Sequence, residues 1–247
     1  MCGTGKERGM SIRKNAAGRI MSVLVTVMVA MVFCTAAANA ASVKVITKAK
    51  VYGMGVYEYK YNAKGQLIKI KRGRNNHGVF SYKSGRPVKY MYVQNGKKGT
   101  VNYKYDKKHR LYESVDSMKG WKRTIRYYYK KSHKRPYRIK EKTTGNSCVT
   151  FDNISWSKFD LPTKWTLPGY GTDKAAYNKK GYKIRGPEEQ YTYKYQKNKI
   201  IQNCNGLWNR TNTFKTIKVK TKKQAKAAKK AQYLIVESGL PIITTPS

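Results

Sequence analysis

Few residues in this chain could carry out catalytic chemistry, and none has the spacing of a familiar active site. Each of the three histidines, at positions 77, 109 and 133, lies in a polar segment typical of a turn. No His/Cys spacing fits zinc and no glycine-rich loop fits a phosphate. The adjacent Glu188 and Glu189 would point to opposite sides of a strand, whereas a glycosidase needs two carboxylates across a cleft. We expect a protein that is not an enzyme and needs no cofactor or metal; an unfamiliar enzyme or toxin is the alternative.

The composition favours electrostatic binding instead. The 247 residues include 53 Lys and Arg against 12 Asp and Glu, a formal net charge of +41. Such a charge attracts polyanions. We expect anionic cell-wall polymers or anionic glycans as partners, with extracellular nucleic acid in second rank. In the competing interpretation, the lysines only keep a tyrosine-rich sheet soluble and protect its edges. The sequence leaves the oligomeric state open.

Residues 1–40 have the pattern of an export signal. Basic residues precede an apolar stretch over residues 20–33, and Ala38-Asn39-Ala40 matches the small-residue cleavage pattern. The apolar stretch is shorter than the roughly 20 residues of a spanning helix. We therefore predict cleavage after Ala40 and a secreted or cell-surface protein, with an uncleaved N-terminal membrane anchor as the alternative.

Two of the four cysteines, Cys148 and Cys204, lie beyond this signal. An even number of cysteines in an exported chain is typical of a disulfide. We predict that these two are bridged; the alternative is two separate buried thiols.

The elements that position the lysines come from an internal repeat of roughly 22 residues. Each unit has two aromatic residues two positions apart, then a polar turn, then an aliphatic residue six positions after the second aromatic. The clearest copies begin at Tyr59-Lys60-Tyr61-Asn62, Phe80-Ser81-Tyr82-Lys83, Tyr103-Lys104-Tyr105-Asp106 and Tyr193-Lys194-Tyr195-Gln196. With looser copies, the second aromatics fall at 61, 82, 105, 129, 151, 177 and 195. This interval is the length of one β-hairpin with its connection.

The repeat predicts an all-β fold over residues 41–220, an antiparallel meander of about seven hairpins that is either a twisted open sheet or partly closed. Alternate residues share a face, so the tyrosines line one side and Lys60, Lys104 and Lys194 the other. On the returning strand of the first unit, Lys69 and Lys71 extend this basic side. These five lysines are the candidate binding residues for a polyanion.

The pattern of two tyrosines, Asn or Asp, glycine and leucine resembles the YD repeats of bacterial Rhs and teneurin-type proteins. It is also similar to the repeats of exported proteins from Gram-positive gut bacteria. The resemblance covers roughly residues 50–205, and the unit at Tyr103 has His109-Arg110 where a Gly-Arg is expected. It implies a β-hairpin repeat architecture. Rhs proteins enclose a toxin in a shell of many such repeats, and seven irregular units are too few for a shell.

The middle of the chain interrupts the rhythm with prolines and two tryptophans, Trp156 and Trp165. An irregular loop with tryptophan is either a platform for sugar or a plug over the end of the sheet. The first option makes the chain a carbohydrate-binding module in which exposed Trp and Tyr carry the affinity. A structural envelope protein with no soluble ligand is the other alternative.

Residues 221–238 predict the only helix of the exported part, followed by a tail over residues 239–247. Thr221 and Gln224 form a capping box. The apolar stripe consists of Ala227, Ala228, Ala231, Leu234 and Ile235. Because this stripe is mostly alanine, we expect the helix to dock on the sheet; an anionic membrane surface is the alternative.

Overall fold

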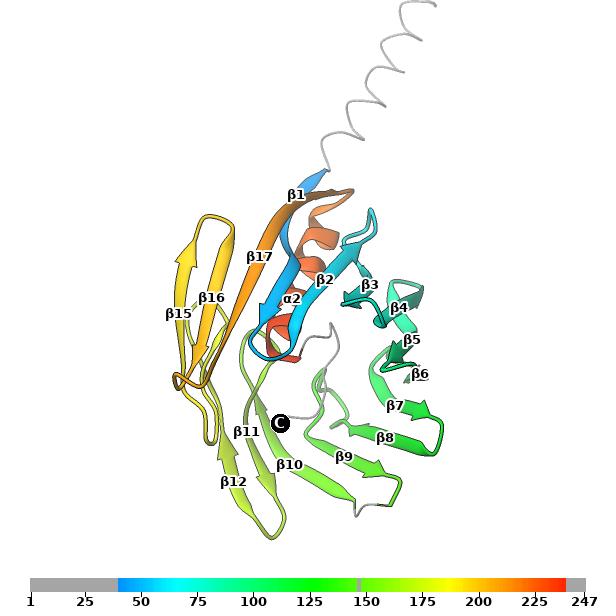
Figure 1. Cartoon of the computed structure of the whole chain (residues 1–247). Helices are drawn as coiled ribbons and strands as arrows, with labels where there is room; N and C mark the ends of the chain where they lie inside the picture. Colours follow the sequence, from blue (N-terminus) through cyan, green and yellow to red (C-terminus); the bar gives the residue numbers. More distant parts are fainter. Residues whose placement is uncertain (1–39, 146–147, 239–247) are drawn as a thin grey trace, which may run out of the picture.

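A computed structural model of the chain describes residues 40–145 and 148–238. Residues 1–39 of the predicted signal and the whole predicted tail lie outside the described residues. Within them, β-strands run from Ala41 onward and one helix, α2, covers Lys222–Ser238 (Figure 1). The strands are β1 Ala41–Val51, β2 Gly55–Tyr61, β3 Leu67–Arg72, β4 Asn76–Lys83, β5 Arg86–Gln94, β6 Lys97–Tyr105, β7 Leu111–Met118, β8 Trp121–Tyr128, β9 Arg138–Thr143, β10 Val149–Trp156, β11 Pro162–Leu167, β12 Gly171–Lys174, β13 Ala176–Tyr177, β14 Lys183–Arg185, β15 Tyr191–Gln196, β16 Lys199–Cys204 and β17 Trp208–Val219.

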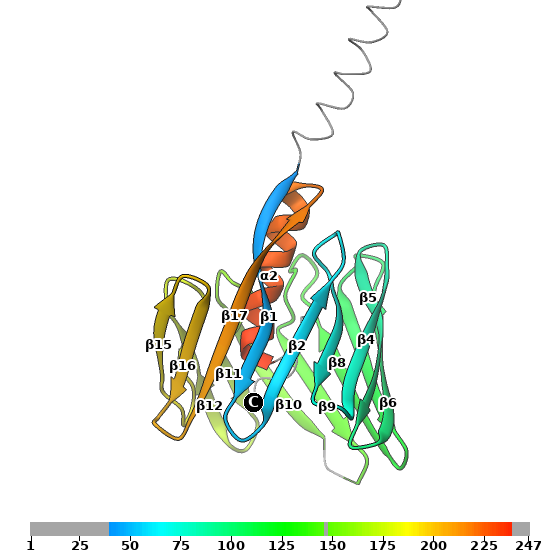
Figure 2. The ribbon, with the colours of Figure 1, turned by 45° about the horizontal axis from the view of Figure 1, so that its top comes forward.

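Fifteen of these strands form one antiparallel sheet, which confirms the predicted all-β meander. From β12 to β1 each strand pairs with its neighbour in the chain; β17 then joins β1, and β16 and β15 follow. The sheet is not closed, because β12 and β15 are both edge strands. It curls, and these two edges come round to the same side of the molecule (Figures 1 and 2). The hairpin of β13 and β14 connects them, with β14 against β15.

Four loops share one geometry, and this is the structural basis of the repeat. In each loop a leading Asn, Asp or Ser accepts backbone N–H bonds through its side-chain oxygen, and a residue three positions later has a positive φ. The leading residues are Asn62, Asp106, Ser157 and Asn178. The positive-φ residues are Gly65, His109, Asp160 and Gly181. This conformation favours glycine, so His109 occupies it at a cost.

In three of the hairpins the returning strand, β3, β5 or β7, carries one extra residue, which breaks the hydrogen-bond register beside the loop. The irregularities lie at Lys60/Tyr61, Ser81/Tyr82 and Lys104/Tyr105, and β1 has another at Ile46/Lys48. A β-bulge of this kind bends a strand and increases its twist. Because the bulges recur at the same end of successive hairpins, they explain why the sheet curls.

In five of the seven units the second aromatic bonds the strand of the preceding unit near its bulge. Tyr61 donates its hydroxyl to the carbonyl of Ile46 at 2.8 Å, and Tyr82 to that of Leu67 at 2.7 Å. The same bond joins Tyr105 to Pro87, Tyr129 to Leu111 and Tyr177 to Pro162. At 151 the aromatic is phenylalanine, and the indole of Trp156 donates to Pro136 instead. The tyrosine repeat therefore supplies partners for carbonyls close to the breaks in the register.

The helix α2 lies inside the curl and docks on β1 and β17, as expected (Figures 1 and 2). Ala228 and Ile235 of the predicted stripe are buried, whereas Ala227 is exposed and Gln232 belongs to the buried face. One half of the capping box forms, because the backbone N–H of Gln224 donates to Thr221 Oγ1 at 3.2 Å. The Gln224 side chain accepts the backbone N–H of Lys220, one residue before Thr221, at 3.0 Å. Buried Gln232 accepts the Ile46 amide beside the β1 bulge at 2.8 Å. Buried Arg210 of β17 donates to the Ile235 carbonyl at 3.2 Å. These polar bonds fix the helix against the bulged strand.

The predicted faces of the hairpins are largely correct. Tyr59, Tyr103 and Tyr191 are buried on the side that faces α2, whereas the intervening lysines are exposed on the outer face, the side away from the helix. Tyr195 is an exception at 39% exposure, because it lies near the open edge of the sheet.

Candidate functional site

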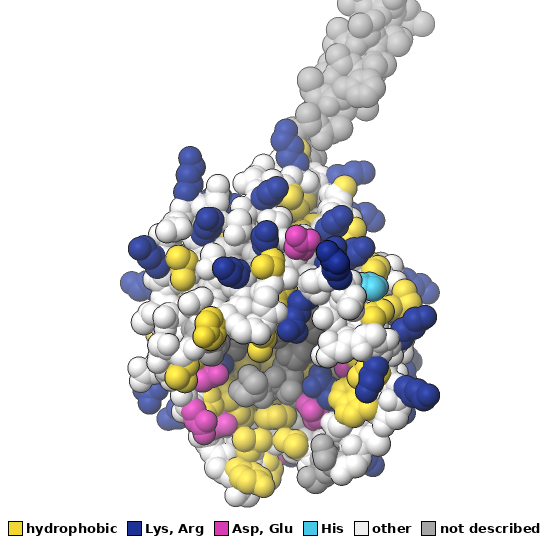
Figure 3. All heavy atoms as spheres, in the orientation of Figure 1, with side chains coloured by type: hydrophobic (Ala, Val, Ile, Leu, Met, Phe, Trp, Pro, Cys, Tyr) yellow, Lys and Arg dark blue, Asp and Glu magenta, His cyan; other side chains and the backbone are white. Residues whose placement is uncertain are grey.

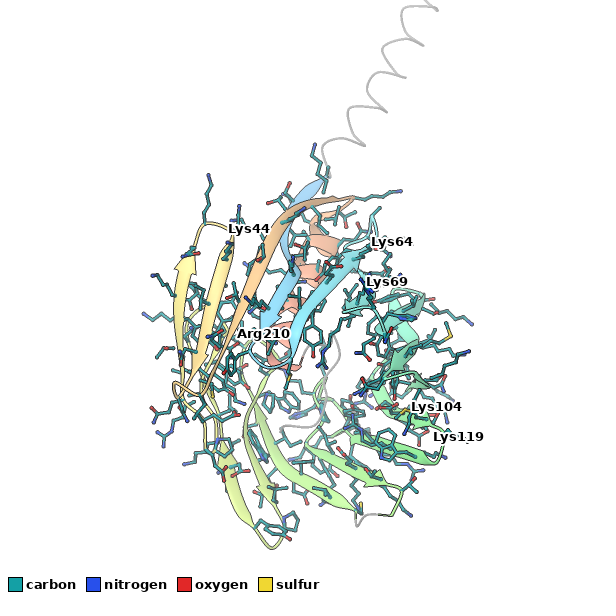
Figure 4. All side chains as sticks on the ribbon, viewed as in Figure 1. Lys44, Lys64, Lys69, Lys104, Lys119 and Arg210 are labelled. Atoms are coloured by element: carbon teal, nitrogen blue, oxygen red, sulfur yellow. The ribbon has the colours of Figure 1, made fainter. Side chains whose placement is uncertain are left out.

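The five predicted lysines share the outer face but do not form a continuous basic row. Lys60 and Lys69 are direct cross-strand neighbours, and Lys71 pairs in register with Glu58. Two strands separate β3, which carries Lys69, from β6, which carries Lys104 (Figure 4).

A nearby carboxylate and a position at the edge of the sheet further separate the predicted lysines from one another. Lys104 binds Glu113 at 2.9 Å, and the same carboxylate binds Arg126 at 3.0 Å. These two cations hold the pKa of Glu113 below its usual value. Lys194 lies on the edge strand β15. The outer face therefore presents lysines whose charge is interrupted and in part locally neutralised.

The two predicted tryptophans belong to the core, which corrects their assignment as binding residues. Trp165 is 2% exposed and packs with Ile139 and Phe151. Trp156 packs on the same cluster. A ring as deeply buried as that of Trp165 has no face for a sugar. Trp156 and Trp165 lie on β10 and β11 of the main sheet, so this segment is neither a sugar platform nor a plug over the end of the sheet.

The predicted disulfide is not formed. Both cysteines are free thiols, with Cys148 exposed ahead of β10 and Cys204 buried at the end of β16. Their strands lie in different parts of the sheet, because β17 and β16 join it beyond β1. Burial raises the pKa of the Cys204 thiol.

The structure shows a strong charge asymmetry between the two ends of the sheet. Successive strands are antiparallel, so their loops alternate between these ends. We call the loops at the upper end in Figure 2 the basic rim. Their Lys and Arg residues are Lys64, Lys107, Lys108, Arg110, Lys130, Lys131, Lys134, Arg135, Lys158, Lys179, Lys180, Lys197 and Lys220. Among the described loop residues of the opposite end, Arg74 and Lys119 are the basic ones.

Acidic groups at the basic rim are few and are paired. Of the described rim loops, two carry a carboxylate: Asp106 binds Arg110 at 2.7 Å, and Asp160 binds both Arg135 and Lys230. Asp160, Arg135 and Lys230 line a hollow of about 520 Å³. His133 and Lys134 complete its wall. In the space-filling view, lysine and arginine fringe the molecule while acidic side chains are sparse (Figure 3).

Part of the basic rim borders a second hollow, of about 590 Å³, which we call the lysine–tyrosine pocket; Lys179, Lys180 and Lys197 belong to both. The turn between β15 and β16, the loop between β13 and β14, and the helix α2 contribute to its wall. Its lining comprises Lys44, Phe159, Lys179, Lys180, Tyr182, Tyr195, Gln196, Lys197, Lys199, Ile200, Phe214, Lys229, Gln232 and Tyr233. Six of these described residues are lysines and none is acidic.

Contacts within the pocket hold several of these side chains in place. Lys44 donates to the carbonyl of Lys197 at 3.0 Å, although 153 positions separate them (Figure 4 labels Lys44). The ammonium of Lys180 lies 3.7 Å from the ring centroid of Tyr195, whose hydroxyl accepts a bond from Asn178 at 2.9 Å. The pocket is therefore a partly ordered basic and aromatic surface.

No protein-family model matches the chain, and no curated protein is significantly similar to it. Among the described residues, no helix is long and apolar enough to cross a membrane. No group of three or more His, Cys, Asp or Glu side chains is placed to hold a metal in the described part of the chain.

Sequence reasoning missed both the basic rim and the lysine–tyrosine pocket. A signal for the rim was available, because lysine pairs follow the turn residue in Asp106-Lys107-Lys108 and Asn178-Lys179-Lys180. In an antiparallel meander, loops after every second strand gather at one end, so these pairs could have been placed together. The pocket had no such signal, because it needs β1 beside β17.

Proposed function

We propose that this chain is an exported, non-catalytic protein that binds anionic polymers of the cell surface or matrix, such as cell-wall polymers or anionic glycans. The basic rim is the contact surface. The observation that carries this proposal is the concentration of lysine and arginine in the loops of one end of the sheet, against two such residues in the described loops of the other.

Physical chemistry favours an extended anion as the partner. Exposed lysines contribute at most about 1 kcal/mol each to an ion pair. A flexible polymer contacts many loops at once, and the tethering makes successive contacts intramolecular. Loops of successive hairpins follow the curled edge of the sheet, so the rim offers a continuous series of such contacts.

Export is part of the proposal, and it is supported by the cleavage pattern at residues 38–40. The first strand begins at Ala41, directly after the proposed cut, and pairs there with Val219. N-terminal sequencing of protein recovered from culture medium tests this: the chain should start at Ala41, and full-length chain confined to the membrane fraction contradicts it.

Kinship with YD-repeat proteins is also a proposal. It is supported by the shared geometry of the loops that follow Tyr61, Tyr105 and Tyr177, where a leading Asn or Asp organises the turn.

The experiment compares two triple variants that lose the same charge. One replaces Lys64, Lys107 and Lys131 of the basic rim by glutamine. The control replaces three exposed lysines of the outer face, namely Lys60, Lys89 and Lys194. Binding to purified cell wall and to heparin is measured at about 0.15 M and about 1 M salt, where the Debye lengths are about 8 and 3 Å.

The rim variant should bind at least about tenfold more weakly at the lower salt, and the control should change much less. Equal weakening of both variants would show that total charge, rather than the rim, governs binding. Binding that persists unchanged in about 1 M salt would contradict an electrostatic mechanism altogether.

A further inference from the structure

The lysine–tyrosine pocket has the size and charge of a site for one unit of an anionic polymer. Its volume of about 590 Å³ falls within the range of about 300–1,000 Å³ of small-molecule sites. Six lysines line it, and none of its described lining residues is acidic. An anionic group is therefore attracted and meets no opposing carboxylate on the wall.

The ring geometry of the pocket does not suit a flat base. Tyr182 is tilted by 50° against Tyr195 and by 69° against Tyr233, so these pairs form no parallel-walled slot. The ring of Tyr195 already has the Lys180 ammonium 3.7 Å from its centroid and stacks with Tyr193 at 6.2 Å. The rings instead offer apolar edges beside hydroxyl groups, which match the mixed C–H and O–H surface of a pyranose.

The phenols add hydrogen-bonding groups without adding negative charge. Burial raises the pKa of Tyr182 and Tyr233 above the ordinary value of 10.0. Both hydroxyls therefore stay protonated at neutral pH, and a protonated hydroxyl both donates and accepts hydrogen bonds.

We infer that the lysine–tyrosine pocket binds a single acidic sugar residue, a uronate or a sulfated hexose, within the polymer that the basic rim holds. The anionic group faces Lys180 and Lys197, and the sugar ring lies along the exposed edge of Tyr195, whose ring centroid already has the Lys180 ammonium 3.7 Å away. This inference rests on the proposed function, and it adds ligand chemistry to a surface that would otherwise recognise charge alone.

The experiment titrates the protein calorimetrically, at about 0.15 M salt, with a galacturonate trimer and with a heparin-derived disaccharide. The methyl-esterified trimer keeps the rings and removes the charge, and an oligothymidylate of equal charge replaces sugar rings by bases. At least one acidic sugar probe should bind, and the neutral ester should bind at least about tenfold more weakly. Oligothymidylate binding as tight as that of both sugar probes would overturn the inference.

Two variants locate the binding. Tyr195→Leu removes the ring, and Tyr170→Leu is its control at a tyrosine that is 91% exposed in the loop between β11 and β12, at the opposite end of the sheet. Tyr195→Leu should weaken the acidic sugar probe about tenfold, the effect of losing one aromatic contact. Lys180→Gln should weaken binding of the acidic sugar probe by up to about fivefold. Its control, Lys119→Gln, should leave this binding unchanged. Circular dichroism shows that each variant is folded.

The results separate this inference from the proposed function. If polymer binding still depends on the basic rim while Tyr195→Leu changes the affinity of neither short probe, the pocket is not a sugar site and the rim proposal stands. If the short probes respond but the rim variant binds heparin normally, the pocket is a site and the rim is not.

Discussion

Tyr105 tests whether the bonds between repeats stabilise the sheet. Its hydroxyl donates to the Pro87 carbonyl at 2.8 Å, and Tyr105→Phe removes this bond while keeping the ring. Losing the bond and leaving a part-buried carbonyl without this partner should lower the free energy of unfolding by about 1.5 kcal/mol. For a chain of this size, that corresponds to a fall in Tm of roughly 3–6 °C.

The pH dependence of this difference gives a sharper test. Burial raises the pKa of Tyr105 to about 12, although Arg86 opposes the shift. In the unfolded chain the pKa is about 10, so between pH 10 and 12 the unfolded state loses this proton first. The stabilisation from Tyr105 is therefore complete below pH 10 and is lost as the pH rises towards 12.

If the whole pKa difference acted, the free energy of unfolding of the wild type would fall by about 1.4 kcal/mol for each pH unit in this window. Because solvent reaches part of the Tyr105 ring, we expect about half of this loss. The variant lacks the phenol and escapes this loss. The difference in free energy of unfolding between the wild type and Tyr105→Phe should thus shrink by about 0.7 kcal/mol from pH 9 to pH 11.

Urea unfolding at pH 7, 9 and 11 measures both quantities. Tyr112→Phe is the matched control, because Tyr112 is 41% exposed, and it should stay within about 0.5 kcal/mol of the wild type. A Tyr105→Phe effect below about 0.5 kcal/mol at pH 7, or a difference that widens above pH 10, would refute the reasoning.

Three further predictions concern other parts of the fold. Gln232→Leu leaves the Ile46 amide without its bond and should cost about 2 kcal/mol in urea unfolding; an unchanged midpoint would mean that the helix does not depend on it. His109→Gly relieves a positive φ of 63° and should raise the stability by about 0.5 kcal/mol, whereas a loss would show that the histidine side chain contributes more than the strain costs. A thiol reagent should label exposed Cys148 in the folded protein and buried Cys204 only on unfolding; a reductant that lowers Tm would instead reveal a bridge.

The sequence by itself determined the features that arise from neighbouring residues. Alternating tyrosines and polar turns predicted the meander, because strand alternation and turn chemistry act over a few positions. Thr221 as the helix cap and the apolar positions Ala228 and Ile235 likewise predicted α2 and its docking on the sheet. The spacing of the second aromatics was visible, but their bonds to the preceding strands were not, because the bulges appear only when two strands are aligned.

Tertiary structure decided where distant residues meet. The return of β17 to β1 brings Lys44 to Lys197 and builds the lysine–tyrosine pocket, and no local pattern specifies this pairing. It also decided that Trp165 is a core residue, because the inward side of β11 faces other apolar side chains rather than water. Net charge was evident from composition, whereas its concentration at one rim depends on which loops the antiparallel order gathers. Long-range pairing therefore sets which lysines lie close enough together to form one basic surface.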